Sequence, residues 1–168
     1  KWCVKEPKDY HKFLKWIPST TNSFGIIFNH FYIIQGRRLC WKCGRETKVI
    51  AFGIEFFCDF FNGEYFHGIF PPKSEGIFAV AALSHLPDNV LNYAQEHYHF
   101  RQRYSKSAQD VYYANECDHC GALQGAHYLF ESDGPFRVFS AEGASRLLLY
   151  RVPLEYDFLD EPIGIVSD

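Results

Sequence analysis

Two copies of a Cys-x-x-Cys-Gly element, at residues 40–44 and 117–121, constrain the fold of this chain more than any other feature. Two thiolates separated by two residues on a tight turn can face one ion, and the glycine that follows supplies the positive φ that closes the turn. Two such zinc knuckles provide four sulfur ligands for a closed tetrahedral site. The sequence therefore predicts one structural Zn²⁺ ion, bound by Cys40, Cys43, Cys117 and Cys120.

The residues around the knuckles disfavour a redox role. A thioredoxin-type Cys-x-x-Cys opens a helix after a strand, whereas the residues after Cys43 are β-branched and aromatic, which is typical of a strand. The 73 residues between Cys43 and Cys117 exceed the roughly 15–20 of a compact zinc ribbon. We therefore predict a split site of zinc-ribbon or treble-clef type, with an insertion at about residues 58–108.

The length and the apolar pattern favour an α+β fold. A chain of 168 residues is most economically one β-rich domain, here residues 1–168, with a strand–helix unit inserted between the knuckles. One segment alternates, so that Ile50, Phe52, Ile54 and Phe56 share a face. The segments expected to form strands are 25–34, 48–57, 76–83 (a central strand), 110–114 and 145–154, the last stopped by Pro153.

One helix is expected after the apolar segment 76–83. Asp88 is the expected N-cap, and Val90, Leu91, Ala94 and Tyr98 follow at helical spacing. The basic residues 101–106 then suit a helix C-terminus, where cations meet the negative end of the dipole. The remaining C-terminal segment is acidic and rich in turn-forming residues.

The charge is distributed unevenly along the chain. Residues 1–50 hold 10 Lys/Arg and 3 Asp/Glu, whereas residues 51–168 hold 7 and 17. The simpler interpretation is that the basic residues 1–50 pack against the acidic residues 51–168. Basic neighbours of the first knuckle would also favour thiolates. The alternative is a nucleic-acid-binding zinc ribbon that contacts phosphates through the basic segment 37–48, with Trp41 or Tyr104 as stacking platforms.

The other residues with reactive side chains form no recognisable catalytic motif. No Ser/His/Asp arrangement, phosphate-binding glycine loop or His-Glu-x-x-His helix occurs. His97 and His99 would point apart on a helix, His119 is expected to point outward from its knuckle, and core positions are expected for His30, His67 and His127. Cys58 is expected to be a buried inert thiol and Cys3 an unpaired terminal one. An enzyme whose site is invisible to motif reading stays a second alternative.

Three pieces of the sequence resemble a known family. They are CWKCGRETKV (40–49), YSK (104–106) and YYANECDHCGALQG (112–125). Together they resemble a family of small, largely uncharacterised bacterial proteins that pair a C-W-K-C-G-x-x-T element with a later Y-x-A-N-x-C-x-H-C-G-A-x-Q-G element. The resemblance covers roughly residues 40–130 and implies that the four knuckle cysteines are metal ligands. It implies no activity.

The leading functional interpretation is a zinc-stapled intracellular protein-binding module. Aromatic residues make up 18% of the chain, and aromatic residues and Arg are enriched at protein interfaces. An immunity or antitoxin role would suit a small bacterial protein, whose acidic tail (Glu155, Asp157, Asp160, Glu161) could cover a basic site on a toxin. No stretch reaches the roughly 18 apolar residues of a membrane helix, and no signal peptide is visible, so we expect a cytoplasmic protein without a membrane partner.

Overall fold

The computed structural model describes residues 23–160 except for 28, 56, 62–63, 69–75, 81–84, 107–108, 132 and 139. The predictions for Cys3, Phe56, residues 81–83 and Glu161 fall outside these residues. The side chains of Cys58 and His67 also lie outside the described part of the chain.

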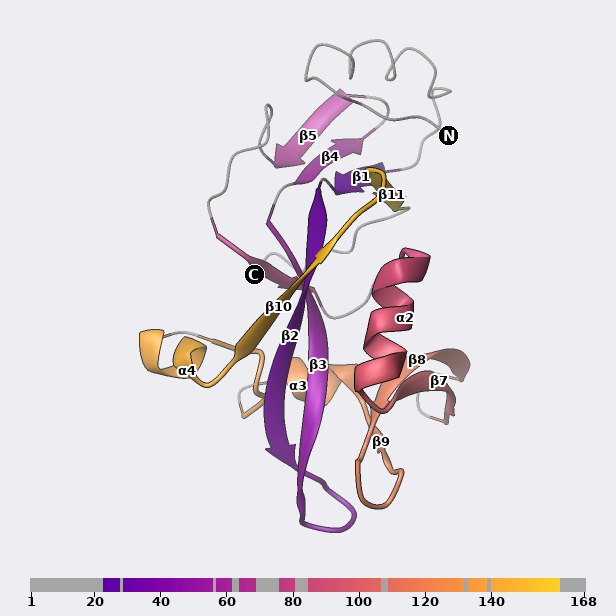
Figure 1. The fold of residues 1–168 in the computed structure, drawn as a ribbon, viewed down its shortest axis with the longest axis vertical. Coiled ribbons are helices and arrows are strands. Elements are labelled where there is room, and N and C mark those ends of the chain that lie inside the picture. The colour runs from indigo at the N-terminus through magenta and orange to yellow at the C-terminus, as the bar shows by residue number, and fades with distance from the viewer. Residues whose placement is uncertain are drawn as a thin grey trace.

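Most of the described chain forms β-strands, which are arranged in three antiparallel sheets (Figure 1). The central sheet has the order β10-β2-β3-β6, with β2 His30–Leu39, β3 Glu46–Ile54, β6 Phe78–Val80 and β10 Leu148–Pro153. A second sheet has the order β11-β1-β4-β5, with β1 Ser23–Ile27, β4 Phe57–Phe61, β5 Glu64–Gly68 and β11 Phe158–Asp160. A third has the order β7-β8-β9, with β7 Phe100–Ser105, β8 Asp110–Glu116 and β9 Leu123–Gln124.

The described helices are few and short, as expected for a β-rich fold. They are α2 Asp88–His97, α3 Ala126–Phe130 and α4 Ala141–Ser145. None of the helices in the described residues is both long and apolar enough to cross a membrane.

Strand β3 is buried on both faces and holds the core together. On one face Ile50, Phe52 and Ile54 pack in a cluster that includes Val90 and Ala94 of α2, which confirms the face predicted for these three residues. On the other face Val49 and Ala51 pack in a cluster with Leu129 of α3 and with Phe136. The long β2–β3 hairpin therefore lies between two apolar layers, and the first knuckle forms its tip (Figure 1).

Two of the predicted strands are each divided between two sheets. Segment 25–34 contains β1, which pairs with β4 and β11, and β2, which pairs with β3 and β10. Asn29 lies between them with a φ of 63°, a left-handed conformation that asparagine tolerates better than most residues. Segment 48–57 likewise ends its first strand at Ile54, and β4 begins at Phe57 in the second sheet. Apolar character continues across both breaks, so the pattern alone does not reveal them.

The segment 76–83 does not form the predicted central strand. Its described part contains only β6, which pairs with β3 at the edge of the central sheet. Phe78 and Ala79 are exposed. A run of apolar residues indicates burial on both faces, but a three-residue edge strand has few neighbours to provide it.

The predicted helix is present, with different ends. Pro87 is the N-cap and Asp88 is the first helical residue, and no side chain caps the helix. The Asp88 carboxylate therefore stabilises the helix only through its position near the positive end of the helix dipole. The helix ends at His97, because Tyr98 is extended with a φ of −139°. The prediction that the basic residues 101–106 form the helix C-terminus is wrong, since residues 101–105 lie in β7 and pair with β8.

The strand predicted at residues 145–154 begins later than expected, and the acidic segment that follows it contains a further strand. Residues Ala141–Ser145 form α4, whose N-cap Ser140 accepts a hydrogen bond from the Gly143 N–H at 3.1 Å. Strand β10 therefore begins only at Leu148, and it ends at Pro153 as predicted. The acidic segment beyond it includes β11, which pairs with β1, so it is not made of turns alone.

Candidate metal centre

Each knuckle closes the tip of a β-hairpin with the same backbone hydrogen bonds. In the first, which links β2 to β3, the Gly44 N–H donates to the Cys40 carbonyl at 2.9 Å. In the second, which links β8 to β9, the Gly121 N–H donates to the Cys117 carbonyl at 3.0 Å. The N–H of each first cysteine also donates across its turn, to Arg45 and to Ala122 respectively, at 2.9 Å. The two turns are therefore equivalent in geometry.

Both knuckle glycines have the positive φ that the sequence predicts, 67° at Gly44 and 66° at Gly121. A Cβ added at either position would meet no atom within 4 Å, so substitution costs backbone strain alone. We expect Gly44→Ala and Gly121→Ala each to lower the free energy of unfolding by about 1 kcal/mol. Urea denaturation of the metal-loaded protein measures this. Gly44→Asn should lose less, because asparagine tolerates a positive φ, and an equal or larger loss would contradict the strain argument.

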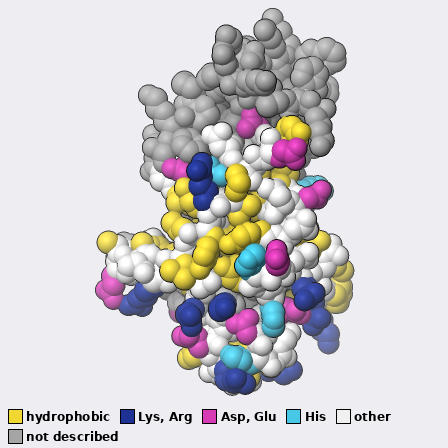
Figure 2. All heavy atoms as spheres, viewed as in Figure 1, with side chains coloured by type: hydrophobic (Ala, Val, Ile, Leu, Met, Phe, Trp, Pro, Cys, Tyr) yellow, Lys and Arg dark blue, Asp and Glu magenta, His cyan; other side chains and the backbone are white. Residues whose placement is uncertain are grey.

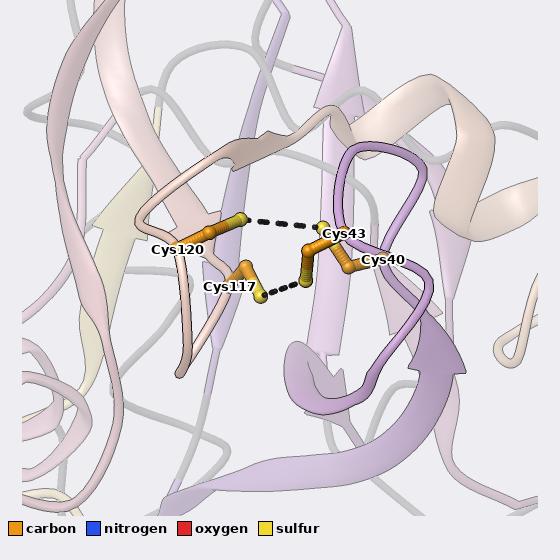
Figure 3. A group of neighbouring side chains, drawn as sticks. All are labelled: Cys40, Cys43, Cys117 and Cys120. Carbon is orange, nitrogen blue, oxygen red and sulfur yellow. Dashed lines mark hydrogen bonds between the residues drawn. The ribbon is translucent and has the colours of Figure 1, made fainter.

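The four cysteine sulfur atoms lie close together between the two hairpins (Figure 3). Cys40 Sγ lies 3.7 Å from Cys120 Sγ, and Cys43 Sγ lies 3.7 Å from Cys117 Sγ. All four lie within 4.8 Å of one another. A tetrahedral centre with Zn–S bonds of about 2.3 Å requires S···S distances of about 3.8 Å. The four sulfur atoms therefore have the spacing that a tetrahedral site for one metal ion requires.

The thiols of this group favour a cation at their centre. Burial raises the pKa of Cys40, but the backbone N–H groups of Cys43 and Lys42 outweigh it and lower that pKa to about 6. At Cys117 burial also raises the pKa, and the N–H groups of His119 and Cys120 bring it below its ordinary value. At Cys120 the Ala122 N–H lowers the pKa, but desolvation and the other thiols raise it to about 11. Neighbouring thiolates repel one another, so full ionisation of the group requires a bound metal ion.

Side chains of β8 and of the second knuckle close the edge of β3 that β6 leaves open. Asn115 Oδ1 accepts from the Ile50 N–H at 2.7 Å, and Asn115 Nδ2 donates to the Ile50 carbonyl at 2.8 Å. Asp118 Oδ2 accepts from the Lys48 N–H at 3.0 Å. His119 Nε2 lies 2.8 Å from the Glu46 carbonyl. Residues 46, 48 and 50 alternate, so their backbone groups point to the same edge of the strand. These side chains thus take the place of a neighbouring strand.

Further contacts join the two hairpins beside the sulfurs. Buried Thr47 accepts from the Asp118 N–H at 2.9 Å. Trp41 Nε1 donates to the Leu123 carbonyl at 2.8 Å. Gln124 Nε2 donates to Cys40 Sγ at 3.4 Å. The four-sulfur group is therefore one part of a wider contact between the hairpins.

The histidines of the described residues have structural contacts rather than ligand positions. His119 is outside the sulfur group, and its ring contacts the first hairpin instead of pointing away from both. His30 is buried as predicted, between Glu55 at 3.0 Å and Arg151 at 3.1 Å. Both ring nitrogens of His30 are thus engaged in a polar network at the junction of β2, β3 and β10.

Two predictions about histidines fail. His127 was expected in the core but lies exposed on α3, where it contacts Glu131 at 3.1 Å. The prediction that His97 and His99 share a helix is wrong, because α2 ends at His97. His99 instead faces Asp118 at 3.8 Å. His127 and His99 both stand next to apolar residues in the sequence. The hydropathy pattern does not show whether such a histidine faces the core or the solvent.

The basic segment 37–48 is partly neutralised within its own hairpin. Arg37 Nη1 lies 2.6 Å from Glu46 Oε1, and both side chains are exposed. Beside the second knuckle, Arg103 pairs with Glu116 at 3.0 Å and Arg101 lies 4.0 Å from the same carboxylate. The Arg37–Glu46 pair, exposed on both sides, stabilises by only about 0–1 kcal/mol, so its main effect is on the surface charge.

Sequence reasoning identified the four cysteines but missed the residues that join the hairpins. Asn115, His119 and Gln124 lie within four residues of Cys117 or Cys120, so the sequence shows that they are close to the second knuckle. Their roles depend on a partner strand more than 60 residues away, which the spacing of the motif does not identify.

No protein-family model matches this chain, and no curated protein or solved structure does either.

Proposed function

We propose that Cys40, Cys43, Cys117 and Cys120 bind one structural Zn²⁺ ion and that the chain is a zinc-stapled protein-binding module. Four sulfur donors at tetrahedral spacing favour zinc among the common divalent metals. Both knuckles lie at hairpin tips, which supports a zinc-ribbon arrangement over a treble clef. The resemblance to the small bacterial family is part of the same proposal.

The observation that carries the protein-binding role is an exposed apolar surface to which both hairpins and α3 contribute. We call it the Trp41 patch: Trp41, Leu123 and Tyr128, with Arg38 at its rim. Trp41 and Tyr128 are 69% and 63% exposed. The Trp41 indole donates to the Leu123 carbonyl, and Arg38 Nη1 donates to the Tyr128 carbonyl at 3.3 Å.

The members of the Trp41 patch are neighbours in space. A Cβ placed on Gly125 would lie 3.4 Å from the Tyr128 ring and 3.8 Å from Leu123 Cδ2. Trp, Tyr and Arg are the residue types that dominate binding energy at protein interfaces. Because the patch combines residues from both hairpins, the zinc ion would hold its two halves in register.

Substitution of the Trp41 patch is expected to abolish partner binding without unfolding the protein. Affinity capture with Trp41→Ala/Tyr128→Ala should lose the partner that the parent protein retains, by at least tenfold in recovery, because each truncation of a hot-spot residue costs about 2 kcal/mol or more. Tyr104→Ala is the matched control, since Tyr104 is 56% exposed on β7. Equal recovery with the patch variant, or loss with the Tyr104 variant alone, would contradict the assignment.

Nucleic-acid binding is the alternative, and the charge distribution disfavours it. Figure 2 shows Lys and Arg side chains interspersed with Asp, Glu and His over the lower half of the face in view. A polyanion would meet the exposed carboxylate of Glu46 within the same segment. We expect weak retention of DNA and RNA at about 0.15 M salt, where charges beyond roughly 8 Å are screened. Sub-micromolar RNA binding that survives this salt and is lost in Arg37→Glu/Arg38→Glu would favour the alternative.

Within the protein-binding class, an immunity-type role in the cytoplasm remains our proposal for the biological context. A groove of about 660 Å³ beside the start of α2 is lined in part by Asp88, Glu155 and Asp157. This acidic lining supports a basic partner surface, as the acidic C-terminal segment suggested.

A further inference from the structure

Strand β10 forms one edge of the central sheet, and its surface is apolar. It pairs with β2 on one side, and among the described residues the sheet ends at β10 on the other. Leu148 and Leu149 are each 50% exposed. Figure 2 shows hydrophobic side chains gathered in a band across the middle of the face in view, where β10 crosses β2 in Figure 1. An exposed apolar edge strand is a template for pairing with another strand.

The register of the sheet shows which backbone groups of β10 face its open edge. The Leu154 N–H donates to the Asn29 carbonyl, on the side of β2, at 2.8 Å. In an antiparallel ladder the N–H and C=O groups of one residue point to the same side, and that side alternates along the strand. Tyr150 and the other even-numbered residues of β10 therefore bond to β2. Leu149 and Arg151 present their N–H and C=O groups to the open edge, where these groups have no hydrogen-bond partner among the described residues.

The open edge is closed just before and just after these two residues. On one side the Leu147 N–H donates to the Ala144 carbonyl at 3.0 Å. On the other side Pro153 has no N–H, and its carbonyl accepts from Asn89 Nδ2 at 2.6 Å. Leu149 and Arg151 are therefore the residues of β10 that offer both an N–H and a C=O to a further strand.

We propose that this edge pairs with the same edge of a second copy of the chain, in antiparallel orientation about a twofold axis at Tyr150. In this register Leu149 of one copy lies opposite Arg151 of the other, and each such pair exchanges two N–H to C=O hydrogen bonds. The two pairs use every N–H that the two edges offer. The two four-stranded central sheets then form one sheet of eight strands.

Other registers of the two copies leave groups unpaired. An axis at Leu149 would place Arg151 opposite Leu147, whose N–H is already bonded. An axis at Arg151 would place two guanidinium groups opposite each other, and Leu149 opposite Pro153, which has no N–H. The free groups of the edge are symmetric about Tyr150, which selects the proposed register.

The side chains suit the same arrangement. Tyr150 faces Tyr150 of the second copy as an aromatic pair, and Leu148 is covered by the second strand. Arg146 precedes β10 and Glu155 follows it, and both are exposed. Antiparallel pairing brings Arg146 of one copy close to Glu155 of the other, in addition to the Glu142 that Arg146 contacts in its own copy at 2.6 Å.

Cysteine cross-linking of the zinc-loaded full chain tests the register. Facing residues of a non-hydrogen-bonded pair have Cα atoms about 4.5 Å apart, which is within the range of a disulfide. Tyr150→Cys should therefore give a disulfide-linked dimer under mild oxidation, located by mass spectrometry of the linked peptides. Leu148→Cys is the matched control. Its two copies would lie about 14 Å apart, so it should not link to itself although Leu148 is the more exposed residue.

Analytical ultracentrifugation between about 1 and 500 µM measures the association, and a small interface of this kind is expected to have a Kd on the order of 10 µM. Leu149→Pro removes an N–H that has no partner within the chain. Proline is tolerated at such an edge position, so the variant should fold, bind zinc and stay monomeric. Leu149→Ala keeps the N–H and should weaken dimerisation only about fivefold.

Amide exchange of the parent protein decides the proposal even where Leu149→Pro fails to fold. The Leu149 and Arg151 N–H groups should become more protected as the protein concentration rises, whereas the Tyr150 N–H, which bonds to β2, should not change. A monomer at all concentrations, a dimer in which these two amides exchange unchanged, or equal cross-linking of Tyr150→Cys and Leu148→Cys would overturn the proposal. Because the edge of β10 lies outside the Trp41 patch, such a failure would leave the role of that patch unaffected.

Discussion

Cys40→Ser is expected to eliminate zinc binding and to separate the two hairpins that the proposed zinc ion joins. Cys40 is buried beside Cys117 and Cys120, and its sulfur also accepts from Gln124. An unfolded chain has no preformed site, so the metal-binding free energy adds to folding stability, by about 10 kcal/mol or more at neutral pH. Elemental analysis should find one zinc per chain in the parent and none in the variant. Thermal unfolding should show the loss of the cooperative transition.

The control for this variant is Cys58→Ser, the same chemical change on β4 in a different sheet. It should retain one zinc ion. Chelation of the parent should accelerate amide exchange at residues 46–50 and 115–119, whereas α2 should keep more of its protection. Parent protein without zinc, protein with iron in its place, or exchange unchanged by chelation would refute a stabilising zinc centre.

Asn115→Asp is expected to cost about 3 kcal/mol of unfolding free energy while zinc stays bound. Asn115 is 6% exposed, and its amide both accepts from and donates to the backbone of Ile50. The aspartate keeps the bond from the Ile50 N–H but places a second oxygen against the Ile50 carbonyl, so a buried carbonyl loses its donor and a carboxylate is buried with one oxygen facing another acceptor. Denaturant titration with parallel zinc analysis measures both quantities.

Asn92→Asp provides the matched control, because Asn92 is exposed on α2. Its effect should stay within about 0.5 kcal/mol. If the two variants lose the same free energy of unfolding, the hydrogen bonds of Asn115 to the β3 edge contribute no special stability, and the prediction is wrong. Loss of zinc from Asn115→Asp would instead show that Asn115 acts through the metal centre.

Local features of the fold could be read from the sequence because their causes are local. The glycine after each knuckle has the predicted positive φ because the turn closes within five residues. The shared face of Ile50, Phe52 and Ile54 follows from the period of a strand, which needs no knowledge of the partner. The end of β10 at Pro153 likewise depends on one residue that lacks an N–H.

The strand boundaries depended on contacts that the pattern does not contain. The apolar run 25–34 is divided because β1 and β2 pair with different strands, and the basic segment 101–106 joins a strand because β8 lies beside it. A helix C-terminus and an exposed edge strand can both be rich in Lys and Arg. The choice between them is made by the neighbouring element.

The sequence by itself determined the identity of the four clustered cysteines and the form of their two turns, since spacing and glycine conformation are properties of short segments. Only the tertiary structure decided what surrounds them. The closure of the β3 edge by Asn115, the exposed patch around Trp41 and the contact of Gln124 with Cys40 each require two segments 65 to 84 residues apart to lie side by side. Such contacts arise from how the hairpins pack, and no local pattern encodes which atoms then meet.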